Sequence, residues 1–543
     1  MLPIQKGDLV GCYDKGTLLE DRFSVIQRLG SGAFGIVDLV RERQSNARRV
    51  CKTVTTKGFK LDAVAMMKKE IRLLQELDHP RIVRLFGYSE DPSSGKLRLI
   101  LEYLAGGSLD TLLQGDELPC ETLVARLMEQ TLSATSYCHS RGIVHCDLKP
   151  ENIIMTEVPQ ARGGGHLSCC SRCFWGRRSK LVDCKVIDFG LSARFSSVEP
   201  ESIRHMAGTA AFIAPEVLSV KTGGAYGPKA DLWAIGMITY LLLTGRLPFG
   251  PIADLDAVTV FRKVRAFEGL GAVAAKQELS ADAYDFLTSL LVPEPRKRLS
   301  AADALKAKWF RRRPSVHYKK IRRSTLRSLQ EYAASPELVR VCLFLIAAKA
   351  EGKSDRRAQQ AFMRLDTTGH GTISKEDLRN AIASPGGWFP GCCYPTVDVD
   401  ELLNSINLSQ IGCLQYTEFA AALLHAELGG KKGRQLAGLA FAAVDEDGDG
   451  VVTVDQLQAF FGAKRKGQTP FLSMFPPNKS LDELEFYKCL RPPKQSPFAY
   501  LCSPFWRRCY PEKTDLPGPD YLNESSSYSC DSPSISSSAD DIE

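Results

Sequence analysis

The chain has 543 residues, of which 44% are hydrophobic and 24% are charged. These proportions are typical of a soluble globular protein, and the length predicts about two to four domains. The formal net charge of +7 is modest for this length, so bulk electrostatics do not indicate a nucleic-acid partner. No apolar run approaches the roughly 20 residues of a membrane helix, so no transmembrane segment is expected.

Residues 1–22 form an N-terminal extension without the charged-then-apolar layout of a secretory signal. Leu2 stands where N-myristoylation requires glycine, so that lipid anchor is not expected. The 17 cysteines are therefore interpreted as reduced thiols of a cytoplasmic protein rather than as a disulfide framework.

A strand pattern at residues 23–29 runs into a glycine-rich turn and a second strand. Because glycine has no Cβ, the backbone of such a turn can approach nucleotide phosphates. Lys52 lies on the next strand and Glu70 on the helix predicted over residues 64–77, where they can pair. Residues 101–104 are expected to form a hinge that holds adenine. The expected nucleotide-binding residues are Leu29, Gly30, Ser31, Gly32, Ala33, Phe34, Gly35, Val37, Lys52, Glu70, Glu102 and Leu104.

Two further segments carry the chemistry of phosphoryl transfer. Residues 145–152 read His-Cys-Asp-Leu-Lys-Pro-Glu-Asn, and an Asp-Phe-Gly sequence begins at Asp188. Phosphoryl transfer needs a carboxylate beside the attacking hydroxyl and oxygen ligands for the magnesium that screens the phosphates. We assign the first role to Asp147, with Lys149 steadying the transferred group, and magnesium binding to Asn152 and Asp188. These motifs are typical of a serine/threonine protein kinase that uses ATP and Mg²⁺.

Two departures from the usual motifs bear on regulation and specificity. Cys146 replaces the arginine that usually precedes the catalytic aspartate and pairs with a phosphorylated activation loop. Control by activation-loop phosphorylation is therefore not expected. Ser108 stands where related kinases often hold a glutamate that binds a substrate arginine, although Glu151 and Asp110 can still favour basic substrates.

The second half of the chain contains a calcium-loop sequence at residues 445–456. Such a loop supplies oxygens from positions 1, 3, 5, 7, 9 and 12, with glycine at position 6. Gln456 at position 12 offers one neutral oxygen, which predicts weak binding. The expected ligands are Asp445, Asp447, Asp449, the carbonyl of Val451, and Gln456.

A weaker calcium site is predicted at residues 366–377, where His370 is a poor ligand for a hard cation. Its expected ligands are Asp366, Thr368, Thr372 and Asp377. The loop at 407–418 places Ile411 at a ligand position, and the loop at 474–486 contains two prolines. Neither of these two loops is expected to bind metal.

The order of kinase motifs, basic junction and calcium-hand repeats resembles the calcium-dependent protein kinases of plants and protists. The resemblance implies an α+β bilobal protein kinase fold followed by an all-α, calmodulin-like EF-hand domain. The predicted parts are an N-terminal extension at 1–22, a kinase domain at 23–310, an autoinhibitory junction at 311–355, degenerate EF-hands at 356–490 and a disordered tail at 491–543.

In that family the connector blocks the active site at rest, and calcium-loaded hands grip the connector and free the cleft. Here the resemblance implies that an amphipathic helical connector at 321–350 exchanges partners in this way. The alternative is a helix packed permanently on one lobe. The basic residues near Arg312 and Arg322 resemble a substrate sequence, for occupation of the cleft or autophosphorylation, but such a run is more often simply solvated.

An insertion at 156–183 lengthens the segment before Asp188 and contains Cys169, Cys170 and Cys173. A mobile surface insertion is the preferred interpretation, while zinc binding and cysteine acylation with peripheral membrane association remain alternatives.

The leading hypothesis is a monomeric serine/threonine kinase that acts on protein substrates and is regulated by calcium through its own hands. One alternative is a constitutively active kinase with structural, calcium-insensitive hands. Another is a catalytically silent, calcium-responsive scaffold.

Overall fold

The computed structural model describes most of the chain between residues 10 and 490. The described ranges are 10–12, 19–32, 35–43, 45–55, 61–91, 95–115, 117–158, 182–196, 198–250, 256–272, 279–311, 322–349, 353–383, 398–428, 430–445, 448–453, 455–457 and 480–490. All of them belong to one compact unit, residues 1–493. The cysteines at 169, 170 and 173 and the predicted tail lie outside the described residues.

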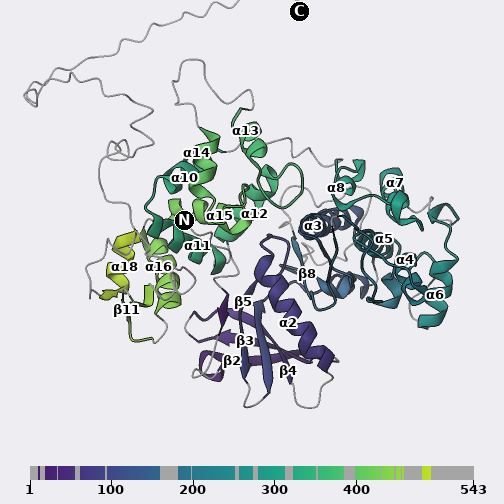
Figure 1. Cartoon of the computed structure of the whole chain (residues 1–543), viewed down its shortest axis with the longest axis horizontal. Helices are drawn as coiled ribbons and strands as arrows, with labels where there is room; N and C mark the ends of the chain where they lie inside the picture. Colours follow the sequence, from purple (N-terminus) through teal and green to yellow (C-terminus); the bar gives the residue numbers. More distant parts are fainter. Residues whose placement is uncertain are drawn as a thin grey trace, which may run out of the picture. The chain divides into compact units, whose positions relative to one another are not determined.

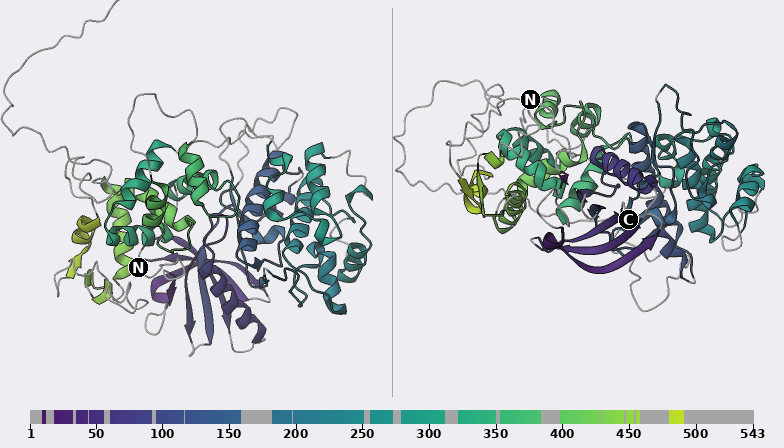
Figure 2. Two further views of the ribbon diagram at one scale, coloured as in Figure 1. Left: turned by 45° about the horizontal axis from the view of Figure 1, so that its top comes forward. Right: turned by 60° about the horizontal axis from the view of Figure 1, so that its bottom comes forward.

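A six-stranded sheet with the order β1-β5-β6-β4-β3-β2 dominates the first part of the chain (Figures 1 and 2). The strands are β1 (Gly11–Cys12), β2 (Phe23–Gly32), β3 (Gly35–Glu42), β4 (Arg48–Thr55), β5 (Leu85–Asp91) and β6 (Lys96–Glu102). Neighbouring strands from β2 to β6 pair antiparallel, and β1 joins β5 in parallel. After the short helix α1 (Leu19–Arg22), the main helix of this lobe is α2 (Leu61–Glu76), which packs against β4, β5 and β6.

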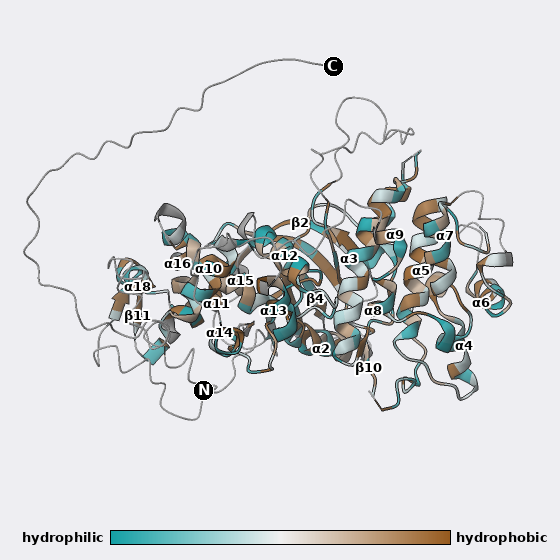
Figure 3. Ribbon diagram, turned by 90° about the horizontal axis from the view of Figure 1, so that it is seen from above, coloured by the Kyte–Doolittle hydropathy of each residue, from teal (hydrophilic) through white to brown (hydrophobic). Residues whose placement is uncertain are grey.

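The following lobe is helical, and its core surrounds α5 (Lys229–Thr244). Trp233, Ile235 and Leu242 of this helix are fully buried, and Figure 3 colours much of α5 brown, the colour of hydrophobic residues. The other helices are α3 (Glu121–Ser140), α4 (Pro215–Leu218), α6 (Ala257–Arg265), α7 (Ala281–Leu290), α8 (Ala301–Ala304) and α9 (Lys308–Arg311). In the sequence, the apolar runs at residues 122–141 and 230–245 are typical of buried helices, and α3 and α5 begin and end one residue earlier than these runs.

Two short strand pairs build the floor of the site between the lobes. They are β7 (Ile143–Val144) with β10 (Ala193–Arg194), and β8 (Ile153–Met155) with β9 (Cys184–Val186). A buried ion pair braces the helical lobe beneath them, because Arg298 donates to both carboxylate oxygens of Glu216, at 2.7 and 3.1 Å. Bidentate pairing of this kind fixes the geometry as well as the charge.

The C-terminal part forms a second hydrophobic core made of helices. Its helices are α10 (Arg323–Ala333), α11 (Glu337–Lys349), α12 (Lys353–Leu365), α13 (Lys375–Ala383), α14 (Val399–Ile406), α15 (Tyr416–Leu424), α16 (Gly430–Val444) and α18 (Glu483–Leu490). Two calcium-type loops pair through the bridge Ile373↔Leu414, and two through β11 (Val451–Thr453) and β12 (Ser480–Asp482). The predicted fold class is confirmed: a sheet-rich lobe and a helical lobe, followed by a region of paired helical hands.

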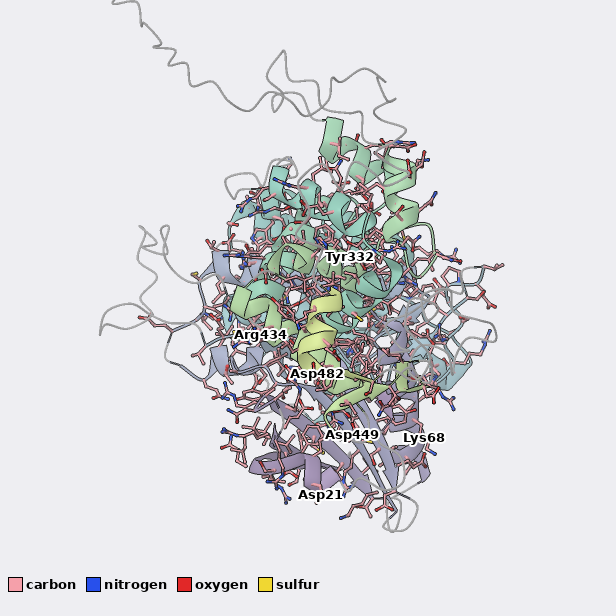
Figure 4. The ribbon with its side chains drawn as sticks, turned by 90° about the vertical axis from the view of Figure 1, so that its left-hand side faces the viewer. Asp21, Lys68, Tyr332, Arg434, Asp449 and Asp482 are labelled. Atoms are coloured by element: carbon pink, nitrogen blue, oxygen red, sulfur yellow. The ribbon has the colours of Figure 1, made fainter. Side chains whose placement is uncertain are left out.

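The predicted connector at 321–350 is divided into two helices, α10 and α11, with Ser335 and Pro336 between them. Proline removes a backbone donor, and the residue before it is biased away from helical geometry. Leu329 and Tyr332 of α10 are fully buried in the same core as Val341 and Leu345 of α11. Figure 4 shows Tyr332 enclosed by helices of this region. In this structure the described part of the connector is therefore a component of the hand domain.

Candidate active site

Lys52 joins strand, helix and metal-loop groups at the centre of the site. Its Nζ atom, on β4, lies 2.7 Å from Glu70 Oε2 on α2 and 3.0 Å from Asp188 Oδ1. Burial alone would lower the pKa of Lys52, but the two carboxylates raise it well above its ordinary value. Burial would likewise raise the pKa of Asp188, but Lys52 lowers it. Both groups are therefore held in their charged forms, as a phosphate-positioning lysine and a metal ligand require.

The glycine-rich segment spans the end of β2 and the start of β3. Gly30 pairs with Val37 across the β2–β3 hairpin, and Gly32 pairs with Gly35. Gly35 has a φ of 110°, and a Cβ at this position would lie 2.2 Å from the Thr53 carbonyl oxygen. Only glycine fits there. Leu29 is 43% exposed and Ser31 is exposed, whereas Ala33 and Phe34 lie outside the described residues.

The predicted catalytic carboxylate is held by three side chains. Thr209 Oγ1 donates to Asp147 Oδ1 at 2.7 Å, Lys149 Nζ lies 3.2 Å from Asp147 Oδ2, and Asn152 Nδ2 donates to the same oxygen at 3.2 Å. Lys149 Nζ also donates to Thr209 Oγ1 at 3.1 Å. A threonine at position 209 fits the residue preference of serine/threonine kinases, and its hydrogen bond to the carboxylate becomes visible in the folded chain.

Asn152 turns its amide nitrogen toward Asp147 and donates to the main-chain oxygen of that residue at 2.8 Å. This orientation makes the amide oxygen of Asn152 the atom available to a cation. Together with the charged Asp188 it offers hard oxygen ligands, which fit magnesium. The residues present therefore match the metal that the motifs imply.

Cys146 adopts a left-handed conformation with a φ of 68°. Asp231 on α5 holds this strained residue in place by accepting from the backbone nitrogens of His145 and Cys146 at 2.9 and 3.0 Å. Burial and the nearby Asp231 raise the pKa of the Cys146 thiol to about 12. A neutral thiol cannot pair with a phosphate as arginine does, so this geometry agrees with the departure seen in the sequence.

Glu102, at the predicted hinge, is held by Lys185, whose Nζ donates to both carboxylate oxygens at 2.8 Å. The backbone nitrogen of Arg84 also donates to Glu102 at 3.3 Å. Sequence motifs gave no signal for Lys185 or Arg84, because neither belongs to a recognisable pattern. Leu104 is the last residue of the predicted hinge and is half-buried.

The grouped residues line a cavity of about 110 Å³. Its walls are Lys52, Val54, Ala63, Met66, Met67, Glu70, Asp147, Lys149, Asp188, Gly190 and Leu191. The cavity thus contains the predicted phosphate, catalytic and metal residues, with apolar residues of α2 on one side.

The predicted calcium loop at 445–456 has an exposed opening turn. Asp445 accepts from the backbone nitrogens of Gly448 and Gly450 at 3.0 and 3.2 Å, and Gln456 Oε1 accepts from Thr453 N at 2.8 Å. Asp447 lies outside the described residues. Figure 4 shows Asp449 and Asp482 at the paired strands β11 and β12. The half-buried carboxylate of Asp445, the exposed carboxylate of Asp449 and the Val451 carbonyl are oxygen donors of the kind that calcium prefers.

Carboxylates of the loop at 366–377 bind protein groups. Asp366 accepts from Gly371 N at 2.8 Å, and Asp377 accepts from Ser374 N at 2.9 Å. Burial raises the pKa of Asp366 to about 6. Thr368 and Thr372 complete the predicted ligand set.

Within the described ranges, no group of three or more His, Cys, Asp and Glu side chains is arranged to hold a metal ion. The described helices also include none that is long and apolar enough to cross a membrane. The insertion was interpreted as a mobile surface segment, with zinc binding and acylation as alternatives, and its cysteines at 169, 170 and 173 lie outside the described residues.

Comparison with known proteins adds independent information. Residues 23–310 match the family described as "Protein kinase domain". Calcium-dependent protein kinase 3 of Plasmodium berghei (strain Anka) is 28% identical over 455 residues, covering 83% of this chain and 74% of that protein. Calcium-dependent protein kinase 33 of Arabidopsis thaliana is 28% identical over 443 residues, covering 80% of this chain and 77% of that protein. The similarity therefore extends beyond the catalytic region and supports the resemblance drawn from the motifs.

Proposed function

Because the chain belongs to the protein kinase family, an enzyme class that uses ATP and Mg²⁺, we propose that it transfers the γ-phosphoryl group to serine or threonine of protein substrates. The observation that carries this proposal is the charged cluster of Lys52, Glu70 and Asp188 inside the cavity that also contains Asp147.

Each residue has a role that follows from its contacts. Asp147, oriented by Thr209 and Asn152, accepts the proton of the substrate hydroxyl. Lys149 lies beside that carboxylate and steadies the phosphoryl group as it moves. Lys52, held by Glu70, positions the phosphates.

The nucleotide lies between the glycine-rich turn and the hinge. The turn's exposed backbone nitrogens approach the phosphates, and the hinge around Glu102 and Leu104 binds adenine through its backbone. Asn152 and Asp188 hold magnesium, which neutralises charge on the phosphates when it is bound.

We further propose regulation by calcium through the loop at 445–456. The names of the relatives point to such regulation, and Asp445, Asp449 and Val451 supply suitable oxygens. Gln456 replaces the bidentate glutamate, so calcium binding should be weak, with a dissociation constant of about 10⁻⁵ M or larger. A constitutively active kinase is the alternative that a calcium titration separates from this proposal.

The proposed substrates carry serine or threonine near basic residues, because the exposed Glu151 stands beside the catalytic loop. A monomeric cytoplasmic protein is proposed, and the connector helices α10 and α11 are its intramolecular partner.

The test is phosphate transfer from ATP to matched serine, threonine and tyrosine peptides with basic flanks. We expect transfer to serine and threonine, and loss of transfer in Asp188→Ala because the metal ligand is removed. Lys297→Ala, which alters an exposed ion pair with Glu294, serves as the matched control. If the unaltered chain transfers no phosphate, and the unaltered chain and Asp188→Ala bind the peptides equally well, the catalytically silent scaffold is favoured.

A further inference from the structure

The segment between α2 and β5 is attached to the first pair of hands, residues 353–424, by a buried carboxylate. Asp78 Oδ2 accepts from Thr417 N at 2.9 Å, and Asp78 Oδ1 accepts from Thr417 Oγ1 at 2.7 Å. Both residues are 1% exposed. Thr417 lies in the first turn of α15, so a carboxylate of the kinase domain satisfies a backbone donor at the start of a hand helix.

A second buried contact lies a few residues further along the same segment. Arg84 Nη2 donates to Asp355 Oδ1 of α12 at 3.1 Å, and the two side chains are only 6% and 8% exposed. Tyr416 also donates its hydroxyl to Asp355, and Gln359 Nε2 donates to the other oxygen at 2.8 Å. A pair this well satisfied can remain charged while buried.

The loop of the first hand is pressed against the kinase domain at its glycine. Gly371 has a φ of 73°, and a Cβ there would lie 2.5 Å from Tyr137 Cδ2 and 2.7 Å from His79 Cδ2. The rings of His79 and Tyr137 stack with centroids 5.1 Å apart. The close approach leaves no space for a side chain between loop and rings.

The acidic residues at position 12 of these two loops are already satisfied by protein donors. Asp377 accepts from Ser374 N and Ser374 Oγ at 2.9 and 2.6 Å. Glu418 accepts from the backbone nitrogens of Ser409 and Gln415, both at 2.7 Å, and is fully buried. These bonds hold each loop closed, in the same way that a carboxylate side chain caps the start of a helix.

The side chains at other ligand positions do not fit calcium. His370 in the first loop and Ile411 in the second stand at position 5, where a calcium loop requires a hard oxygen donor from the side chain. An imidazole and an alkyl group cannot replace that oxygen. The donor set therefore disagrees with the metal that the resemblance implies for this pair.

From these contacts we infer that the first pair of hands is a calcium-independent docking module, attached to residues 78–84 with or without calcium. The inference rests on the proposed kinase function and assigns the calcium response to the loop at 445–456 alone. Val83 and Arg81 bond to Val186, two residues before Asp188, at 3.0 and 2.9 Å. The docked hands thus contact the segment that bonds to β9, the strand that leads to the metal ligand Asp188.

The test is hydrogen exchange of the full-length chain, read by mass spectrometry in excess chelator and again in saturating calcium. We expect peptides covering residues 76–86 and 413–424 to show equal protection in both conditions, and only peptides around 445–456 to change. Asp78→Ala should speed exchange in both docking peptides by about tenfold or more in chelator, because a buried charged hydrogen bond is lost.

Asp400→Asn is the matched control, since Asp400 belongs to the same hand pair but is 49% exposed in a surface ion pair. If Asp78→Ala does not fold, Thr417→Val decides, because it removes only the hydroxyl donor to Asp78. Protection that appears only with calcium, or that survives both substitutions, would overturn the inference. Kinase activity that is insensitive to calcium, with protection retained in chelator, would instead contradict calcium regulation while leaving the docking intact.

Discussion

At the scale of single residues, the site depends on hydrogen bonds that fix the direction of charged groups. Asp147 is the clearest case, because Thr209, Lys149 and Asn152 all bind its carboxylate. Thr209 is neutral and, unlike Asn152, is not assigned to magnesium, so its removal changes the orientation of Asp147 without changing the charge of the site.

We predict that Thr209→Val lowers kcat by roughly tenfold to a hundredfold, since a hydrogen bond to a charged group contributes about 1.5–3 kcal/mol. The KM for ATP should change little, because the hydroxyl binds Asp147 rather than the nucleotide pocket. Steady-state kinetics check this, with Thr209→Ser expected to recover most of the rate. A Ser variant as slow as the Val variant would contradict the orienting role.

Gly35 gives a second prediction at this scale. Gly35→Ala should raise the KM for ATP, since its methyl group collides with the Thr53 carbonyl and forces the turn away from the phosphates. Gly30→Ala is the matched comparison, because no atom lies within 4 Å of a Cβ at that position. Nucleotide affinity measured by calorimetry should fall in the first variant more than in the second.

Motifs predicted the pairing of Lys52 with Glu70 because their order along the chain is characteristic. They did not predict the contacts of Arg84 or Lys185, which look like ordinary surface charges in the sequence. Arg84 and Asp355 are 271 residues apart, and no local pattern relates them. The predicted roles of the site residues remain predictions until activity is measured.

At the scale of elements, the carboxylate of Glu418 caps the start of α15, and burying its charge there is unfavourable. Burial raises the pKa of Glu418 to about 7, although backbone donors from Gln415 and Ser409 lower it. The carboxylate of Asp78 on the kinase side also faces Glu418 and disfavours its charge. The helix start is thus sensitive to protonation.

Since the pKa of Glu418 is higher in the folded than in the unfolded chain, the folded state binds the proton more tightly. The stabilising contribution of Glu418 is fully present below its ordinary pKa of 4.5 and is lost as pH rises through about 7. We therefore predict that the midpoint temperature of thermal unfolding is lower at pH 8 than at pH 5. Glu418→Gln should flatten this dependence, whereas Glu376→Gln, at an exposed position, should leave it unchanged.

Apolar periodicity in the sequence predicted the bounds of the long helices of the kinase domain to within a few residues. The division of the connector into α10 and α11 was not predicted, although Pro336 offered a signal for it. The bridges between hand loops were also not predicted, because they depend on contacts between separate loops.

At the scale of the whole molecule, two hydrophobic cores are joined by buried polar contacts. The Arg84–Asp355 pair is the ion pair among these contacts. Removing one partner of a buried pair leaves the other charge uncompensated, which costs more than losing an exposed pair.

We predict that Asp355→Ala lowers the free energy of unfolding by about 3–5 kcal/mol. The double substitution Arg84→Met with Asp355→Leu should recover much of this loss, because no isolated charge is left buried. Chemical denaturation of the full chain checks both variants against Lys297→Ala, whose exposed ion pair with Glu294 contributes little to stability. A double variant no more stable than the single variant would argue against the ion-pair explanation.

The measurement that tests the central claim most directly is kinase activity on a basic serine peptide across a range of free calcium, with ATP and magnesium fixed. The unaltered chain should become more active as calcium rises, and Asp445→Ala should shift the midpoint to higher calcium or abolish the rise. Equal activity in chelator and in saturating calcium would contradict regulation through the loop at 445–456 and leave a constitutively active kinase.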